Sequence, residues 1–315
     1  MSEAFPETIG MKVPAFPIDL LRRWRATALA PESVLDLRTL SRRDPDFRKL
    51  SERSFMAPGR VNELFADDFE EMSPREAMQR QSLINATTLL SVWELERTIA
   101  IFALDYARWL VNSFDWWSGY PTDMIIDNFR PWSTYLALDG IVPVVESDPN
   151  SDFYEGCLLS FVGRQGSLKL QCQLFLKGEG FEPLCCHEID FTRGRKLGDI
   201  AESYEYDTPW AFKAARFVAE NSALGSADQV RMMLTNCGRE ICRRILPLMV
   251  ALISSPFKKT VDIIDHEGRI LERLPGGRCN ERNFNPYLAD IERMRASETF
   301  QFVRFGFGAE TPDFA

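Results

Sequence analysis

The stretch from residue 86 to residue 140 limits the folds open to this chain more than any other part of it. It holds five of the seven tryptophans and reads ATTLLSVWELERTIAIFALDYARWLVNSFDWWSGYPTDMIIDNFRPWSTYLALDG. Because each buried aromatic side chain removes about 150–250 Å² of surface from water, so aromatic a stretch is stable only inside a core. The pattern predicts a long helix that leads into two strands.

The start of this helix is the clearest start signal in the sequence. Ser73-Pro74-Arg75-Glu76 is a capping box with proline at the first helical position. From Leu89 to Leu110, apolar residues recur every three or four positions. The predicted helix therefore covers residues 74–112, with a break near residues 85–88, where helix propensity falls.

Strands are predicted after this helix. Residues 124–126 and 132–138 form apolar or alternating runs, and the strongest hairpin signal follows: CLLSFV, then GRQGS, then LKLQCQLFL. In the return strand, Leu168 to Leu176 alternate with the polar residues Lys169, Gln171 and Gln173. This alternation predicts an antiparallel sheet with one face in water.

The remaining elements are mainly helical. Helices are expected over 195–205 and 210–222, and a capping box at Ser226 opens a helix to residue 255 that Pro247 should kink. The sequence further predicts strands at 260–264 and 299–305, with a helix at 285–297.

The predicted fold class is α+β: an N-terminal helical region followed by a mainly antiparallel sheet packed against long helices. The expected segments are 1–72, helical and basic; 73–275, the α+β core domain; and 276–315, a C-terminal helix and strand.

Charge is unevenly distributed along the chain. The net charge is −9, yet residues 22–60 hold ten Arg and Lys against five Asp and Glu, and residues 61–160 hold five against seventeen. The negative net charge argues against a protein that coats nucleic acid in general, because affinity for a duplex depends on neutralising its phosphates. Three interpretations of the basic segment stay open: docking on the acidic body, a solvated face, or a surface for a partner or RNA. The nucleic-acid interpretation rests on Arg22, Arg23, Arg25, Arg42 and Arg43.

The thiols and the termini indicate a compartment. Seven cysteines in a chain of 315 residues fit reduced thiols better than a disulfide framework. The N-terminal sequence shows no basic region followed by an apolar run, and the longest apolar run is about eight residues, too short for a membrane span. We expect a soluble cytoplasmic protein.

No motif has the spacing of a catalytic, metal or cofactor site. Cys185-Cys186-His187 lacks a second ligand pair, so buried thiols are the better interpretation. His187 and His266 are the only histidines, and no Gly-rich phosphate loop precedes a helix. A hydrolase using Asp123, Asp127 or His266 is the weakest of the hypotheses considered. We therefore expect no cofactor, no metal and no catalytic residue.

An aromatic cluster lies where the long helix gives way to strands. Most of its rings are expected in the core, but Trp and Tyr are also enriched in protein interfaces, where a groove can take an extended or helical peptide. The candidate partner-binding residues are Trp116, Trp117, Tyr120, Phe129 and Trp132.

Over residues 85–275 the sequence resembles a known family, the anti-CRISPR proteins of phages and plasmids, second of the type V-A series. The residues that carry the resemblance are apolar patches in the same order and at similar distances: Thr98–Asp105, Pro121-Thr122, Pro131-Trp132 with Tyr135, Leu197–Tyr204 and Leu246–Pro256. The C-terminal part of the family is basic and His-rich, whereas residues 278–315 contain no histidine and end acidic.

The resemblance implies a non-enzymatic inhibitor of the type V-A CRISPR effector nuclease. The family is one that recognises the effector's N-terminal polypeptide as it emerges during translation and causes loss of its messenger. The partners implied are the effector or its nascent chain, with RNA or the ribosome as a further partner. No binding residue of the family maps onto this sequence.

Overall fold

The structure of the chain is a computed structural model. It describes Ser73, Arg75, Leu89 and Trp93 and residues 97–127, 132–138, 140–144, 151–164, 167–176, 185–207, 211–253, 259–265, 270–274 and 299–305.

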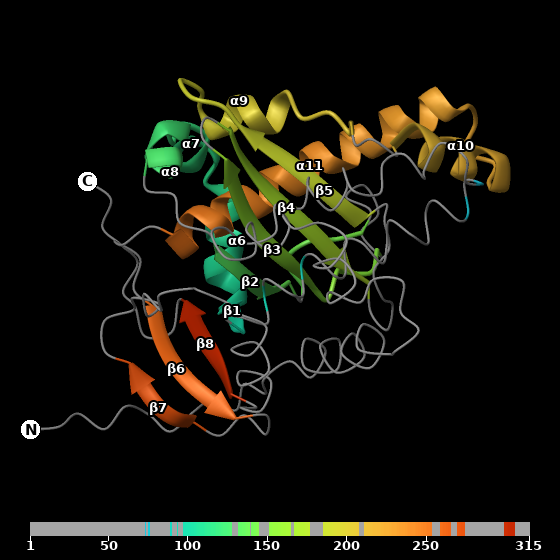
Figure 1. The fold of residues 1–315 in the computed structure, drawn as a ribbon. Helices are drawn as coiled ribbons and strands as arrows, with labels where there is room; N and C mark the ends of the chain where they lie inside the picture. Colours follow the sequence, from blue (N-terminus) through green and yellow to red (C-terminus); the bar gives the residue numbers. More distant parts are fainter. Residues whose placement is uncertain are drawn as a thin grey trace, which may run out of the picture.

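The described strands form one mixed sheet of eight strands (Figure 1). Their order across the sheet is β5-β4-β3-β2-β1-β8-β6-β7. β1 runs parallel to both of its neighbours, β2 and β8, and the other neighbouring pairs are antiparallel. The strands are β1 (Thr98–Phe102), β2 (Trp132–Ala137), β3 (Gly156–Arg164), β4 (Ser167–Phe175), β5 (Cys186–Phe191), β6 (Lys259–Asp265), β7 (Ile270–Leu274) and β8 (Thr299–Phe305).

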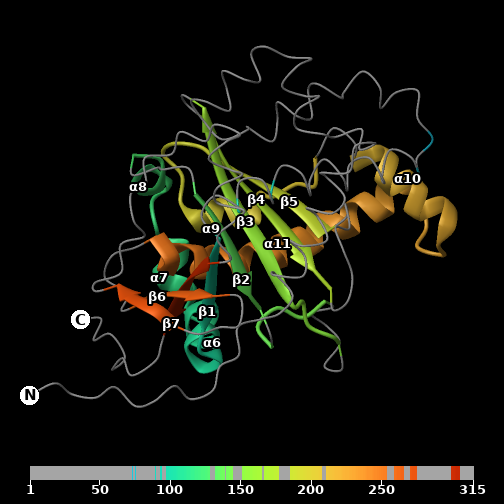
Figure 2. The same ribbon diagram turned by 60° about the horizontal axis from the view of Figure 1, so that its bottom comes forward.

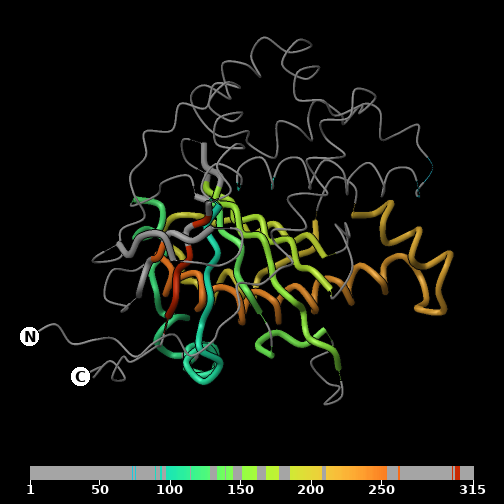
Figure 3. Tube along the Cα trace, turned by 90° about the horizontal axis from the view of Figure 1, so that it is seen from below, coloured from blue at the N-terminus to red at the C-terminus, as the bar shows by residue number. Residues whose placement is uncertain are grey.

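A long helix, α11, crosses one face of this sheet (Figure 3). Its first half extends past β5 together with α10, so the two helices project from one end of the molecule (Figure 2). The helices whose two ends both lie among the described residues are α6 (Leu104–Asn112), α7 (Phe114–Ser118), α8 (Thr122–Asp127), α9 (Leu197–Glu202), α10 (Ala211–Asn221) and α11 (Ala227–Ile253). None of the described helices is long and apolar enough to cross a bilayer.

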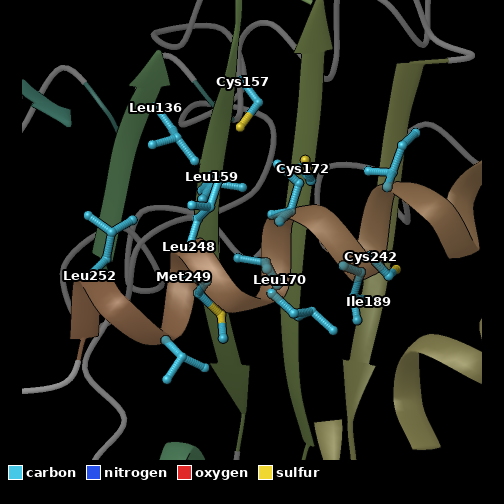
Figure 4. Packing of buried hydrophobic residues seen from close by; sticks show 14 of the residues in the cluster. Leu136, Cys157, Leu159, Leu170, Cys172, Ile189, Cys242, Leu248, Met249 and Leu252 are labelled. Atoms are coloured by element: carbon cyan, nitrogen blue, oxygen red, sulfur yellow. The ribbon is translucent and has the colours of Figure 1, made fainter. Parts of the chain in front are cut away.

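The main core lies between α11 and strands β2 to β5. Side chains from every second residue of these strands meet the last half of α11 (Figure 4). Full burial of a leucine or isoleucine side chain contributes about 1.5–3 kcal/mol, so this layer dominates the stability of the fold. Its members include Leu136, Leu159, Leu170 and Ile189 of the sheet and Leu248, Met249 and Leu252 of α11.

Several predictions from the sequence are confirmed. The fold class is α+β, the hairpin is formed by β3 and β4, and β2, β6 and β8 lie where alternation indicated them. The capping box at Ser226 is present: its backbone N–H donates to Gln229 Oε1 at 2.8 Å, and its Oγ accepts from the Gln229 N–H at 3.4 Å. α11 continues through Pro247 to Ile253.

The predicted helix over residues 74–112, with its break near residues 85–88, is wrong at residues 98–102. Leu89 and Trp93 are helical, but Arg97 takes a φ of 48° and the chain continues as the strand β1. All five residues of β1 are buried, because it lies inside the sheet. A short strand buried on both faces shows no alternation, so its apolar pattern matches that of a buried helix.

The strand predicted at residues 124–126 is also wrong, since these residues belong to helix α8. The Met124 N–H donates to the Pro121 carbonyl at 3.2 Å, which closes the first turn of this helix. Three apolar residues are too few for their periodicity to separate a strand from a helical turn.

The face of the sheet opposite α11 is not the wet face that alternation predicted. Gln171 and Gln173 are buried there, and only Lys169 of the three polar residues is exposed. The Trp93 and Tyr135 rings lie 6.5 Å apart on this face, and Trp93 Nε1 donates to the Thr98 carbonyl at 2.7 Å. A helical segment that includes Trp93 therefore packs where solvent was expected.

The C-terminal part of the chain supplies a strand to the common sheet, because β8 lies between β1 and β6. The division into segments 1–72, 73–275 and 276–315 stays a prediction.

Close packing of α11 on residues 204–206 gives a prediction for Gly238. A Cβ on Gly238 would lie 2.1 Å from Cε1 of the buried Tyr204 ring. We expect Gly238→Ala to lower the free energy of unfolding by about 1–3 kcal/mol, measured by urea denaturation. Gly119→Ala is the matched control, because its nearest atom lies at 3.5 Å and its φ is −76°. Equal stability of the two variants would contradict this packing.

Candidate partner-binding surface

Two segments far apart in the sequence meet at the end of α7. The turn between α7 and α8 pairs with the loop 192–196: the Thr122 N–H donates to the Arg195 carbonyl at 2.9 Å, and the Leu197 N–H to the Tyr120 carbonyl at 3.1 Å. We call the result the junction surface and define it by Trp116, Tyr120, Met124, Arg193 and Lys196.

Of the predicted binding residues, Trp116 and Tyr120 lie on this surface. Both side chains are half-buried, and Trp116 Nε1 donates to the Leu110 carbonyl at 3.3 Å. Met124, in α8, is 52% exposed. The surface therefore combines anchored rings with an exposed apolar side chain, the composition that protein interfaces favour.

Trp117, the third predicted binding residue, lies inside the core. It is 0% exposed and belongs to the core cluster, so in this structure it cannot contact a partner. Neighbouring residues of a short helix point to different sides, and the inner side of α7 packs on α9 and α11.

The other predicted residues are not tested by the structure. Phe129 lies outside the described residues, and Trp132 opens β2 with a side chain that is likewise outside them. The basic group of the nucleic-acid hypothesis, Arg22, Arg23, Arg25, Arg42 and Arg43, also falls outside the described part of the chain, as does His266.

Ion pairs join α8 to the loop 192–196. Arg193 contacts Asp127 at 2.6 Å and Asp123 at 3.4 Å, and the Gly194 N–H donates to Asp123 Oδ2 at 3.0 Å. Gly194 has a φ of +74°, which favours glycine at this turn. Exposed pairs contribute only about 0–1 kcal/mol each, so their main effect is to orient the loop. Both carboxylates of the hydrolase hypothesis are thus engaged with Arg193.

The contribution of the loop 192–196 to this surface was not predicted from the sequence. Arg193, Arg195 and Lys196 form a short basic run directly after β5. That run was a usable signal for a surface loop, but only the tertiary pairing with Pro121 and Thr122 places it beside the aromatic residues.

Most of the cysteine and histidine cluster lies inside the core. Cys186 and Cys242 are buried thiols, as expected, while Cys185 and Cys237 are half-buried. His187 Nδ1 lies 2.9 Å from the Tyr204 hydroxyl, inside the core. Among the described residues, no group of His, Cys, Asp and Glu could hold a metal ion.

Burial of His187 predicts a pH dependence of stability. Desolvation lowers the pKa of His187 from 6.5 to about 4, so the folded state binds fewer protons than the unfolded state between these values. Its stabilising contribution is present above pH 6.5 and is lost as the pH falls toward 4. Between pH 7 and pH 5 the free energy of unfolding should fall by about 2 kcal/mol more than in His187→Gln. Urea denaturation at both pH values measures this difference; parallel pH profiles would contradict it.

Comparison with known proteins supports a fold assignment. No family model matches the sequence, and no curated protein matches it. Among solved structures, the chain is similar to a crystal structure of AcrVA2, an anti-CRISPR protein for type V-A, with a TM-score of 0.51 and 12% identity. The similarity covers 92% of this chain and 84% of AcrVA2. At this identity the likeness shows a shared fold.

Proposed function

We propose that the protein is a non-enzymatic, anti-CRISPR-like factor that binds the type V-A CRISPR effector nuclease, at its N-terminal or nascent polypeptide, and lowers its level or activity. The observation that carries this proposal is the likeness to AcrVA2 over 92% of the chain. The junction surface adds support, because Trp116 and Tyr120 are held by the fold and remain partly accessible. The proposed compartment is the cytoplasm, where the effector is made.

Co-expression with a type V-A effector tests the proposal. The wild-type chain should co-purify with the effector and lower the amounts of its protein and messenger. Unchanged amounts of both, with no co-purification, would refute it.

A variant pair tests the surface. Truncating an aromatic anchor at an interface typically costs 2 kcal/mol or more, so Trp116→Ala combined with Tyr120→Ala should weaken capture by roughly 30-fold. Phe212→Ala is the matched control, because this ring is 58% exposed on α10, away from the junction surface. If both variants lost the same amount of effector capture, the junction surface would not be the binding site. Capture by the wild type would still support the proposed function.

A further inference from the structure

β5 forms one edge of the sheet. It pairs with β4 on one side and ends the strand order on the other (Figure 1). An edge strand whose outer N–H and C=O groups are open can accept an additional strand from another polypeptide.

The hairpin register shows which backbone groups point outward. Arg164 pairs with Ser167 across a two-residue loop, and residues that flank such a loop exchange hydrogen bonds with each other. Because these bonds alternate along a strand, the backbone groups of Leu168, Leu170 and Cys172 point from β4 to β5. Their partners on β5 are Phe191, Ile189 and His187. The N–H and C=O groups of the intervening Glu188 and Asp190 therefore point to the outer side.

These outward groups are open. In the part of the chain that the structure describes, no backbone group on the outer side of β5 accepts or donates a bond at Glu188 or Asp190. The next outward group, the Thr192 carbonyl, accepts from Thr122 Oγ1 at 2.7 Å. The open edge therefore ends at Thr192, where the loop of the junction surface begins.

Charge identifies the occupant. Glu188 and Asp190 project on the same face of β5, and Lys169 lies 3.4 Å from each carboxylate, which leaves one excess negative charge. The Asp190 side chain is 61% exposed. A second copy of β5 would bring Glu188 and Asp190 against the same acidic residues, so self-pairing is disfavoured. A strand with basic residues at alternate positions would be attracted instead.

We propose that the outer edge of β5 binds an extended segment of a partner polypeptide, paired through the backbone of Glu188 and Asp190, with Lys or Arg at alternate positions. The identity of that partner as the effector rests on the proposed function; the edge and its chemistry do not.

Two substitutions of Asp190 distinguish the contribution of its backbone N–H to binding from the contribution of its carboxylate. Asp190→Pro removes an N–H that points outward and leaves the hydrogen bonds to β4 intact. Strands tolerate proline at such an edge position. Asp190→Ala removes the same carboxylate and keeps the N–H. We expect Asp190→Pro to capture the effector roughly tenfold more weakly than Asp190→Ala, with equal urea midpoints for the two variants. Equal capture by both would overturn backbone pairing. If the proline variant is unfolded, amide hydrogen exchange of Glu188 and Asp190 in the wild-type complex decides instead: protection supports the pairing, and unchanged exchange overturns it.

A probe peptide tests the edge without the effector. An eight-residue peptide of alternating lysine and valine should shift the amide resonances of Glu188 and Asp190 in the full chain, and a glutamate–valine peptide should not. If the wild type fails to capture the effector while the lysine peptide binds β5, the proposed function fails and the edge site stands. If the wild type captures the effector, but neither peptide shifts the resonances and Asp190→Pro captures as well as Asp190→Ala, the edge site is refuted and the proposed function stands. A wild-type dimer that Asp190→Pro dissociates would assign the edge to a second copy and overturn the partner.

Discussion

Trp117→Ala is expected to lower the free energy of unfolding by about 3–5 kcal/mol, because it deletes an indole that is wholly buried and leaves a cavity beneath α7. Trp116→Ala, one residue away, should cost much less, because that ring is half-buried at the surface. Urea denaturation of both variants measures the difference. Since a small domain has a total stability of about 5–15 kcal/mol, the Trp117 variant loses a large fraction of it.

Trp116→Ala and Trp117→Ala also distinguish an effect on binding from an effect on stability. Trp116→Ala should reduce capture of the effector while remaining folded, and any loss of capture by Trp117→Ala should follow its loss of folded protein. Similar unfolding midpoints for the two variants would contradict the position of Trp117 in the core and would restore it as a binding residue.

Asp262→Ala is expected to lower the free energy of unfolding by about 3 kcal/mol or more. Asp262 is 0% exposed in β6 and pairs with Arg304 of the neighbouring β8, whose side chain is 16% exposed. Removing the carboxylate leaves the largely buried guanidinium of Arg304 without its counter-charge, which costs far more free energy than the loss of a surface ion pair. Chemical denaturation of the variant checks this value.

Asp127→Ala serves as the comparison, because it breaks the exposed pair with Arg193. Its effect should stay below about 1 kcal/mol. If the two aspartate variants were equally stable, the pair between β6 and β8 would contribute nothing beyond an ordinary surface contact.

The part of the fold that the sequence predicted is the part in which local pattern and burial agree. β4 alternates because α11 covers Leu168 to Leu174 on one side, and α11 is recognisable because Ser226 and Gln229 cap it. In both elements the residues that determine the structure are close neighbours in the sequence.

The failures come from burial that the sequence does not signal. β1 is buried on both faces, so TIAIF shows no periodicity, and Arg97 takes a φ of 48° just before β1 although it is neither glycine nor proline. The buried Gln171 and Gln173 are polar in sequence and covered in the fold, which no alternation rule can foresee.

The candidate surface was predicted in part for the same reason. The sequence shows that the aromatic residues cluster, but which ring faces inward depends on how α7 packs on α9 and α11. The loop that carries Arg193 enters the surface through a pairing across about 70 residues, and the open edge of β5 follows from hairpin register. Both are tertiary facts.

The register of Thr98 with Gln301 has a consequence for how the chain reaches its native state. Two adjacent strands in the middle of the sheet are separated by about 200 positions, so the loop between them must close before their ladder forms. Until β8 has paired, one edge of β1 has unpaired backbone N–H and C=O groups, to which another extended polypeptide can pair. This pairing of distant segments therefore favours slow folding of the newly made chain.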